Sequence, residues 1–154
     1  MPTPTPVRID PSYGIKAVPG EKLPWDQVEA WLVASRNYWI CTTRPDGRPH
    51  AKPVWGAWID DRALWSTGDG SVTGRNLAAN PAVVVHVESG DETAILEGTV
   101  AFERDADLIA RFVEVYADKY DIRLELEEIY GLRPDTCLAW TEADYPNTAT
   151  RWVF

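Results

Sequence analysis

The stretch Thr42-Thr-Arg-Pro-Asp-Gly-Arg-Pro-His-Ala-Lys-Pro-Val-Trp55 carries the turn of a predicted β-hairpin. On either side of the turn, residues 38–43 and 49–59 are rich in the β-branched and aromatic residues that favour strands. Within the turn, Pro45 presets the backbone angle φ and Gly47 accepts a positive φ. Residues along the second strand alternate in character, so one of its faces can line a site while the other packs on a core.

A second strand pair follows directly. It turns at Asp60-Asp61, and its second strand is expected at residues 62–67. A polar, glycine-containing loop from Ser66 to Ser71 then enters a short predicted helix, residues 73–79. Free backbone N–H groups and the helix dipole both attract anions at such a helix start. The loop therefore indicates an anion site, although the pattern alone has little specificity.

The rest of the chain predicts a mainly β fold with flanking helices. The proline-rich residues 1–23 are expected to form an extended arm that crosses a neighbouring subunit, and residues 24–154 a single domain. Further strands are expected at residues 82–88, 92–104, 137–141 and 149–154, and further helices at 25–35, 105–118 and 123–130. Closely spaced antiparallel strands with one short helix inserted indicate a small closed barrel. The continuous apolar run at residues 83–87 predicts a strand buried on both faces.

The composition excludes several classes of function. The net charge of −9 over 154 residues argues against non-specific nucleic-acid binding, which needs a basic surface. Cys41 and Cys137 lie in apolar, strand-like settings without metal-ligand spacing, so we expect buried thiols in a reducing compartment. The two histidines have no carboxylates clustered around them, so no metal site is predicted. The eight tryptophans are first of all core or interface anchors, and their flat rings also suit a planar ligand.

The chain also gives an expectation about its location. No stretch of the sequence has the length and apolarity of a signal peptide or of a membrane span. We therefore expect a cytoplasmic protein that does not associate with a membrane. The acidic residues Glu125, Glu127 and Glu128 are expected to form a solvated helix face rather than a carboxylate site.

A set of short motifs follows in order along the middle of the chain. The motifs are Asp46–His50, Pro53–Gly56, Leu64–Thr67, Arg75–Pro81, Val83–Val87, Gly90-Asp91 and Leu96–Thr99, with Thr148–Trp152 near the end. In this order they resemble the pyridoxamine 5'-phosphate oxidase-like split-barrel family, and more narrowly its actinobacterial flavin/deazaflavin oxidoreductases. The resemblance covers about residues 24–105 and rests on the ordered set, since no single motif is diagnostic. It implies a six-stranded antiparallel split β-barrel of the FMN-binding type.

The resemblance also implies a homodimer with two cofactor sites at the subunit interface, and F420 or FMN as the cofactor. The residues that match cofactor-binding positions are His50, Lys52, Pro53, Val54, Trp55, Ser66, Thr67, Ser71, Thr73, Arg75 and Asn76. Lys52 matches a basic position that contacts the cofactor, and residues 53–55 match the strand beside its ring. Ser66 and Thr67 match the strand end near its phosphate tail. A cation and hydroxyls beside a helix start are what such a phosphate requires.

The sequence departs from the family pattern at one place. Many relatives have basic residues, commonly Arg-Lys, at the positions that match Val72 and Thr73. Losing two charge-assisted hydrogen bonds of about 1.5–3 kcal/mol each weakens phosphate binding by orders of magnitude unless another group compensates. The candidates for compensation are Arg44, Arg48, Arg75 and Arg151, with Arg151 also able to come from the partner subunit.

Three functions are open at this point. The first is a flavin- or deazaflavin-dependent oxidoreductase that moves a hydride between the bound cofactor and a small organic substrate, with F420 slightly favoured over FMN. The second is a non-catalytic split-barrel protein that binds a cofactor or a tetrapyrrole, and the missing basic pair motivates it. The third and weakest is pyridoxamine 5'-phosphate oxidation itself. No catalytic residue can be named, which agrees with hydride transfer because the cofactor then carries the reaction.

Several of these residues also have a purely structural explanation. Lys52 is as well explained by a solvent-facing charge on a strand, and the Arg75-Asn76 pair by pinning of the short helix. His50 is either a neighbour of the ring or a surface residue. His86, in an apolar run, is expected to be a hydrogen-bonded core histidine. Trp55 is a better ligand candidate than Trp58, and packing is the first expectation for both.

Overall fold

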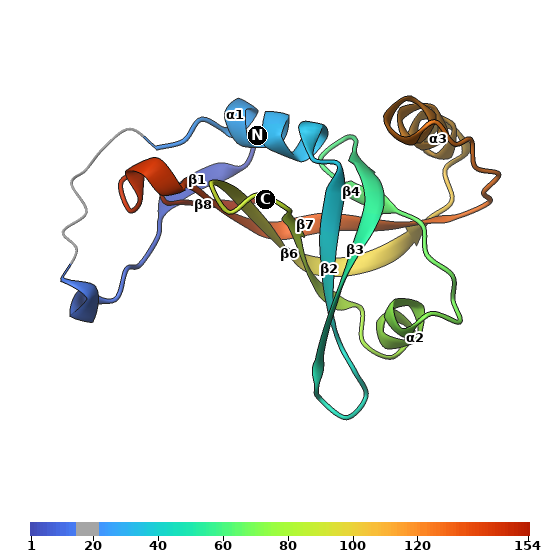
Figure 1. The fold of residues 1–154 in the computed structure, drawn as a ribbon, viewed down its shortest axis with the longest axis horizontal. Coiled ribbons are helices and arrows are strands. Elements are labelled where there is room, and N and C mark those ends of the chain that lie inside the picture. The colour runs from blue at the N-terminus through green and yellow to red at the C-terminus, as the bar shows by residue number, and fades with distance from the viewer. Residues whose placement is uncertain (15–21) are drawn as a thin grey trace.

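The computed structural model describes residues 1–14 and 22–154, and within these residues eight antiparallel strands form one sheet that closes on itself (Figure 1). The strands are β1 (Thr3–Pro6), β2 (Asn37–Thr43), β3 (Pro49–Trp58), β4 (Ala63–Trp65), β5 (Ala82–Val87), β6 (Glu92–Glu103), β7 (Ile129–Thr141) and β8 (Thr150–Val153). The helices are α1 (Trp25–Ala34), α2 (Val72–Ala79) and α3 (Ala106–Tyr120), with 3-10 turns η1 (Pro11–Tyr13) and η2 (Glu142–Asp144). None of the described helices has the length and apolarity needed to cross a membrane.

The barrel consists of six of these strands. The sheet order is β1-β8-β7-β4-β3-β2-β5-β6, and a long pairing between β6 and β7 closes the ring. The other edge of β7 is shared, because its first residues pair with β4 and its later residues pair with β8. Strands β8 and β1 therefore extend the sheet beyond the closed ring. The prediction of a mainly β fold with a six-stranded antiparallel barrel is confirmed.

The central hairpin has the predicted strands and turns. β2 and β3 pair in register from Asn37↔Trp55 to Thr43↔Pro49, and Gly47 has a φ of 85° in the turn between them. The second turn has positive φ at both Asp60 and Asp61, which is the geometry of a two-residue hairpin turn that follows the twist of the strands. Both turns keep the long strand β3 in line with β2 and β4.

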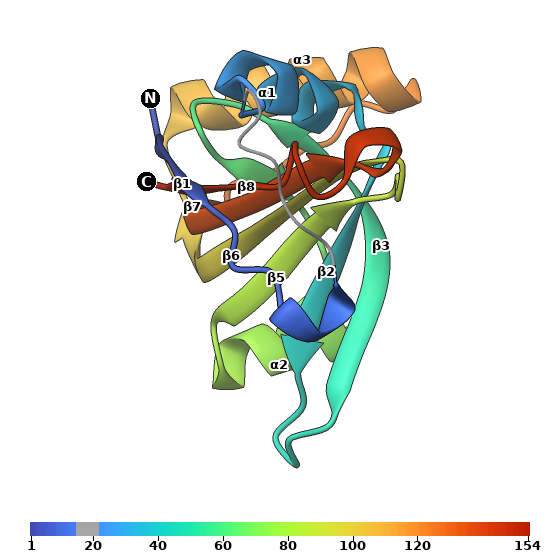
Figure 2. The same ribbon diagram turned by 90° about the vertical axis from the view of Figure 1, so that its left-hand side faces the viewer.

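Two hydrophobic clusters hold the helices to the barrel. The main cluster fills the barrel, and α1 contributes Val28 and Leu32, both fully buried, to one end of it. The second cluster lies between α3 and the outside of β3 and β4, where Phe112 packs with Ala57 and Leu64. Figure 2 shows α1 and α3 on one side of the barrel and α2 on the opposite side. Asp105 caps α3 by accepting a hydrogen bond of 2.8 Å from the backbone N–H of Leu108.

Two predictions about secondary structure are wrong. Residues 123–130 do not form a helix, because the chain is irregular up to Glu128 and enters β7 at Ile129. Leu124 and Leu126 instead pack against the second cluster in alternation with exposed glutamates. The run at residues 83–87 is not buried on both faces, since its residues alternate between buried and half-buried. Its outer face is therefore part of the molecular surface.

The N-terminal residues partly differ from the expected arm. Thr3–Pro6 are extended and pair with β8 of the same chain, and the hydroxyl of Thr5 donates a hydrogen bond of 2.9 Å to the carbonyl of Arg151. Residues 15–21 of the predicted arm lie outside the described residues. The division between an arm and a domain at residues 23–24 stays a prediction.

Candidate functional site

A surface groove of about 400 Å³ runs along β3, between the end of β4 and helix α3. Its lining residues are Asn37, Lys52, Pro53, Val54, Trp55, Ser66, Thr67 and Tyr116. Six of the eleven residues predicted from the family resemblance are in this set. A volume in this range is typical of small-molecule sites. We call this feature the β3 groove.

The groove follows an open edge of the barrel. β4 pairs only with residues Gly56 to Trp58 of β3, so among the described strands residues 49–55 have β2 as their single neighbour. The other edge of this segment therefore has backbone N–H and C=O groups without a partner in the sheet. Lys52 and Val54 point to one face of the strand, and Pro53 and Trp55 to the other. The groove thus offers main-chain hydrogen-bonding groups, one cation and one large aromatic ring.

Trp55 is held in a fixed orientation by α3. Its indole stacks on the ring of Tyr120, with centroids 4.6 Å apart and an interplanar angle of 4°. Tyr116 contacts it edge-on at 6.1 Å, and the guanidinium of Arg36 lies 5.7 Å from its ring centroid. Stacked and edge-on pairs of this kind restrict ring motion as well as burying apolar area. Trp55 is therefore a rigid wall of the groove.

Behind Trp55, two polar side chains of α3 tie the helix to the barrel. The hydroxyl of Tyr120 accepts a hydrogen bond of 3.0 Å from the N–H of Gly56 and donates one of 2.7 Å to the carbonyl of Arg36. The ammonium of Lys119 donates to the carbonyls of Ser35 (2.7 Å) and Gly56 (2.9 Å). Burial, followed by the charge of Arg36, lowers the pKa of Lys119 to about 8, and burial raises the pKa of Tyr120. Sequence reasoning missed these residues.

The hydroxyl end of the groove lies where β4 leads into α2. Ser66 and Thr67 are half-buried there, and the Thr67 hydroxyl lies 3.2 Å from that of Ser71. Ser71 caps α2, because its hydroxyl accepts a hydrogen bond of 3.0 Å from the N–H of Gly74. Ser71 therefore supports the loop and does not line the groove.

Three further predicted residues also lie outside the groove lining. Thr73 is fully buried, and among the described residues its hydroxyl has no hydrogen-bond partner. Asn76 is buried as well and donates a hydrogen bond of 3.0 Å to the hydroxyl of Thr42. His50 is half-buried, and its Nδ1 lies 3.5 Å from the same hydroxyl. The bond between Asn76 and Thr42 thus pins α2 to the hairpin, and a direct role of the three residues with a cofactor stays a prediction.

The arginines that were considered as replacements for the missing basic pair do not line the groove either. Arg75 donates a hydrogen bond to the carbonyl of Gly70, and Arg48 forms an ion pair of 2.8 Å with Asp46. Arg44 stands at the base of the hairpin turn, and Arg151 is on β8, which is not a neighbour of β3. Lys52 is thus the one positively charged residue among those that line the groove.

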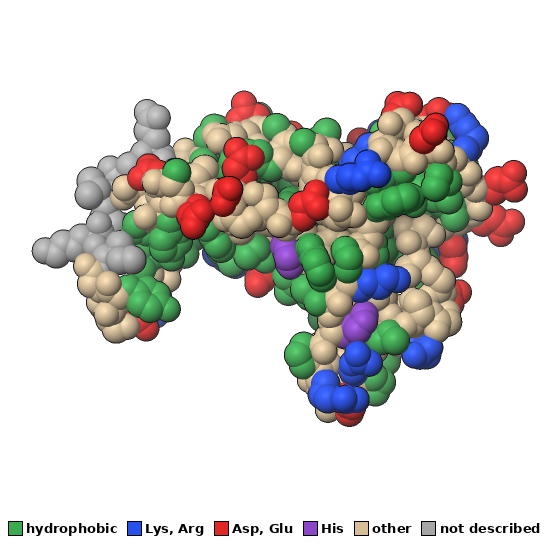
Figure 3. Space-filling model, in the orientation of Figure 1, with side chains coloured by type: hydrophobic (Ala, Val, Ile, Leu, Met, Phe, Trp, Pro, Cys, Tyr) green, Lys and Arg blue, Asp and Glu red, His purple; other side chains and the backbone are tan. Residues whose placement is uncertain are grey.

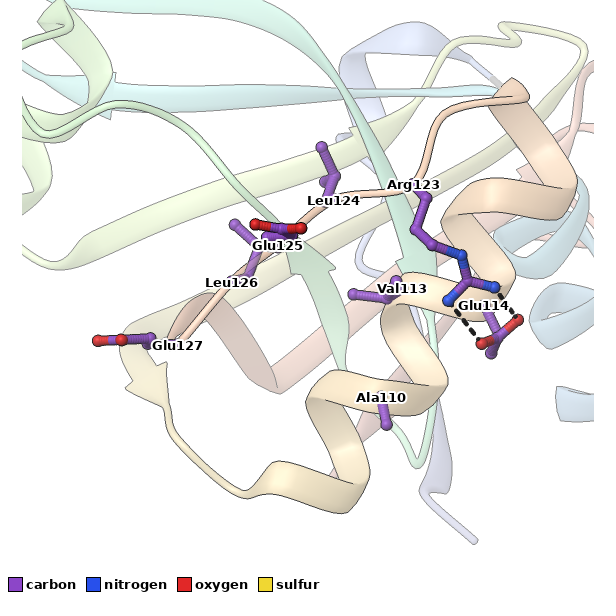
Figure 4. A pocket seen from close by; sticks show the side chains of 8 residues that line it. All are labelled: Ala110, Val113, Glu114, Arg123, Leu124, Glu125, Leu126 and Glu127. Carbon is purple, nitrogen blue, oxygen red and sulfur yellow. Dashed lines mark hydrogen bonds and ion pairs between the residues drawn. The ribbon is translucent and has the colours of Figure 1, made fainter.

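A larger hollow of about 670 Å³ lies between α3 and residues 123–127 (Figure 4). Arg123 forms a two-fold hydrogen-bonded ion pair with Glu114, with both distances 2.9 Å, across its rim. Figure 4 shows the carboxylates of Glu125 and Glu127 apart from each other. None of the predicted site residues lines this hollow. Within the described part of the chain, no group of three or more His, Cys, Asp or Glu side chains is placed to hold a metal ion.

The barrel and its open strand edge define a small split-barrel protein with a groove beside β3. The chain belongs to the pyridoxamine 5'-phosphate oxidase family, whose sequence model matches residues 24–141. This match confirms the family resemblance of the sequence motifs.

Solved structures with the same fold accompany this match. A conserved hypothetical protein of Mycobacterium tuberculosis superposes with a TM-score of 0.68 at 19% identity, over 82% of this chain and 90% of its own. An F420 reductase superposes with a TM-score of 0.56 at 24% identity, over 71% and 94% of the two chains. A heme-binding protein of Mycobacterium smegmatis has a TM-score of 0.64 at 19% identity, over 83% and 58%. No curated protein sequence matches the chain significantly.

Proposed function

We propose that the protein is an F420- or FMN-dependent oxidoreductase that holds its cofactor in the β3 groove and exchanges a hydride with a small organic substrate. The observation that carries the proposal is the grouping in one groove of an open strand edge, the fixed ring of Trp55, the ammonium of Lys52 and the hydroxyls of Ser66 and Thr67. These groups come from β3 and from the segment after β4, as the family resemblance implies.

The groups in the groove fit the parts of such a cofactor. The unpaired N–H and C=O groups of residues 49–55 offer donors and acceptors to the edge of a flat heteroaromatic ring. Trp55 limits where that ring lies, because Tyr120 and Arg36 hold the indole in place. Lys52, Ser66 and Thr67 suit the phosphate tail. When bound, the cofactor supplies the hydride chemistry, and the protein positions it and excludes water.

The single cation of the groove suits the phosphodiester of F420 better than the phosphomonoester of FMN. The phosphodiester of F420 carries one negative charge, whereas a phosphomonoester carries about 1.5–2 negative charges at neutral pH. Lys52 is the one cation among the lining residues, while Val72 is half-buried and uncharged and Thr73 is fully buried. A single ammonium neutralises the phosphodiester but leaves part of the phosphomonoester charge without a partner. The F420 reductase among the similar structures agrees with this preference.

We further propose that the working unit is a homodimer formed through the outer face of β2, β3 and β5. On this face Trp39 is paired with Pro53 and His86, and its ring stacks on the imidazole of His86 with centroids 6.3 Å apart. Cys41 and Val84 continue the face and are only half-buried. Figure 3 shows hydrophobic side chains gathered over β2 and β3 between the two histidines. A second copy on this face adjoins the β3 groove and covers exposed apolar surface.

A fluorescence titration tests the proposal directly. Purified protein is titrated with F420 and, separately, with FMN, and we expect micromolar or tighter binding of at least one, with F420 preferred. Lys52→Ala is expected to weaken binding about tenfold or more, because the tail loses its ion pair. Lys22→Ala removes the same charge from an exposed position outside the groove and is the matched control. Absence of binding to both cofactors, or equal effects of the two variants, contradicts the proposal.

A non-catalytic binding protein is the second candidate. The groove contains no acid–base pair, and one of the similar structures is a heme-binding protein. The half-buried imidazoles of His50 and His86 are groups that can ligate a heme iron. Tight binding of hemin with a Soret shift, together with no turnover of reduced F420 or FMN against enones and quinones, selects this candidate. Pyridoxamine 5'-phosphate oxidation requires sites for two phosphorylated ligands, and the single cation of the groove makes it the weakest of the three.

A further inference from the structure

A second cavity lies on the other side of the loop that follows β4. It has a volume of about 430 Å³ and is enclosed by α2, the second half of β6 and the start of β7. It shares no lining residue with the β3 groove, although residues 66–69 run between them, with Ser66 and Thr67 on the groove and Asp69 on the cavity. We call it the α2 cavity. Figure 1 shows α2 at the side of the barrel that α1 and α3 leave uncovered.

The walls of the α2 cavity are apolar and fixed. Leu77 and Val100 are 4% and 7% exposed, so they belong to the packed core as well as to the cavity. The ring of Tyr130 stacks on that of Trp65 with centroids 5.9 Å apart, and Phe102 packs on Tyr130 at 4.6 Å. Phe102 is nevertheless 40% exposed, and the guanidinium of Arg104 lies 5.3 Å from its ring centroid. The cavity therefore presents preformed aromatic surface to a ligand.

One carboxylate lies at the edge of this apolar surface. The loop that carries Asp69 lies directly against α2 at Gly74. A Cβ at position 74 would meet the carbonyl oxygen of Gly68 at 2.6 Å, so only glycine lets the loop come this close. The hydroxyl of Tyr130 donates a hydrogen bond of 3.3 Å to Asp69. Within residues 1–14 and 22–154, Asp69 forms no ion pair, whereas Glu128, the other acid of the cavity, is paired with Arg104 at 2.6 Å. Asp69 therefore leaves one negative charge without a cationic partner.

We propose that the α2 cavity binds a small amphipathic cation, with a flat apolar body on Phe102 and Tyr130 and one protonated amine on Asp69. The volume accommodates a body of one or two rings. An ammonium that reaches Asp69 gains a charge-assisted hydrogen bond, and its cation also lies near the faces of aromatic rings. An anionic ligand is disfavoured there for the same reason. The proposal does not rest on the ligand of the β3 groove.

An NMR titration of the ¹⁵N-labelled protein tests the proposed cation site. The two probes are 2-naphthylmethylamine, which is a cation, and its neutral isostere 2-naphthalenemethanol. We expect both probes to shift the amide signals of α2 and of residues 100–102, and the amine to bind about fivefold more tightly than the alcohol, because Asp69 is exposed and its ion pair with the amine is screened by solvent. Asp69→Asn keeps the shape and removes the charge, so it is expected to abolish the preference for the amine. Asp118→Asn, at an exposed position in the last turns of α3, is the control and is expected to keep it.

A cavity-filling variant provides a second test. Ala78 is on α2, lines the cavity and is exposed, so Ala78→Phe puts a ring into the cavity without disturbing the core. We expect it to abolish binding of both probes while the melting temperature stays close to that of the parent protein. If Ala78→Phe lowers the melting temperature, the proposal is judged on the map of amide shifts and on the probe preference of Asp69→Asn. The proposal is overturned if neither probe binds or if the shifts map to other elements. It is also overturned if the two probes bind equally well, or if Asp69→Asn keeps the preference for the amine.

Discussion

The indole of Trp55 stacks on the ring of Tyr120, with centroids 4.6 Å apart and an interplanar angle of 4°. The two residues come from β3 and from the last turn of α3, and the hydroxyl of Tyr120 also bonds to Gly56, the residue after Trp55. A helix end thus fixes both the side chain and the backbone at one wall of the β3 groove.

The first prediction separates these two contributions of Tyr120. Tyr120→Phe keeps the stack and leaves the N–H of Gly56 and the carbonyl of Arg36 without this partner, so we expect a loss of about 1–3 kcal/mol in unfolding free energy. Tyr120→Ala also removes a ring that is 6% exposed, and we expect a loss of about 3–5 kcal/mol. Urea denaturation measures both. Tyr13→Phe, at a side chain that is 68% exposed, is expected to have no effect. Equal losses for the two Tyr120 variants would show that the ring of Tyr120 adds nothing to stability beyond its hydroxyl.

Lys119 predicts a pH dependence of stability. Its pKa falls from 10.5 to about 8 on folding, so between these pH values the unfolded state binds more protons than the folded state. The contribution of Lys119 to the free energy of unfolding therefore rises with pH above about 8 and is constant below it. Neutral lysine still has two N–H groups for the carbonyls of Ser35 and Gly56.

The variant Lys119→Met isolates this contribution. The quantity to compare is the difference between parent and variant in unfolding free energy at pH 7 and at pH 10. We expect the parent to gain relative to the variant as the pH rises. A difference that stays constant between the two pH values shows that Lys119 titrates as it does in the unfolded chain.

The parts of the fold that are set by local chemistry could be predicted from the sequence. Gly47 has the expected positive φ, the second turn lies at Asp60-Asp61 as expected, and Asp105 caps α3 near its expected start. The helix predicted at residues 123–130 is wrong because the acidic residues there alternate with leucines that pack on the second cluster. The alternation of Leu124 and Leu126 with glutamates was the better signal, since a period of two indicates an extended chain.

The groove was only partly predictable for a physical reason. Residues 52–55 are consecutive on one strand, so the sequence places them together. Tyr120 is 64 residues from Gly56 along the chain, and only tertiary packing brings it behind Trp55. The spacing of Phe112, Tyr116 and Tyr120 at every fourth residue is a sequence signal for an aromatic stripe on α3, but it does not indicate which strand the stripe covers. Likewise, the burial of Thr73 depends on which face of α2 meets the barrel.

The outer face of the barrel gives a prediction about assembly. If a second copy covers the face around Trp39, then Trp39→Glu places two charges in an apolar interface and produces a monomer. Val33→Glu introduces the same charge on α1, at a side chain that is 53% exposed, and is expected to keep the dimer. Sedimentation analysis of the three proteins at the same concentration gives the result. A parent protein that sediments as a protomer rules out the proposed interface.

The uncharged start of α2 predicts how cofactor preference can be changed. Val72 is half-buried at the first position of α2, so an arginine there can reach solvent and add a cation near the hydroxyls of Ser66 and Thr67. We expect Val72→Arg to strengthen FMN binding about tenfold or more, and F420 binding less, because the phosphomonoester has more unneutralised charge. Thr73→Lys is expected to destabilise the protein instead, since Thr73 is fully buried. Val153→Arg, on the exposed end of β8, is the control for added charge. Fluorescence titration with both cofactors measures the change, and an equal gain for Val72→Arg and Val153→Arg shows that the effect is not local to the groove.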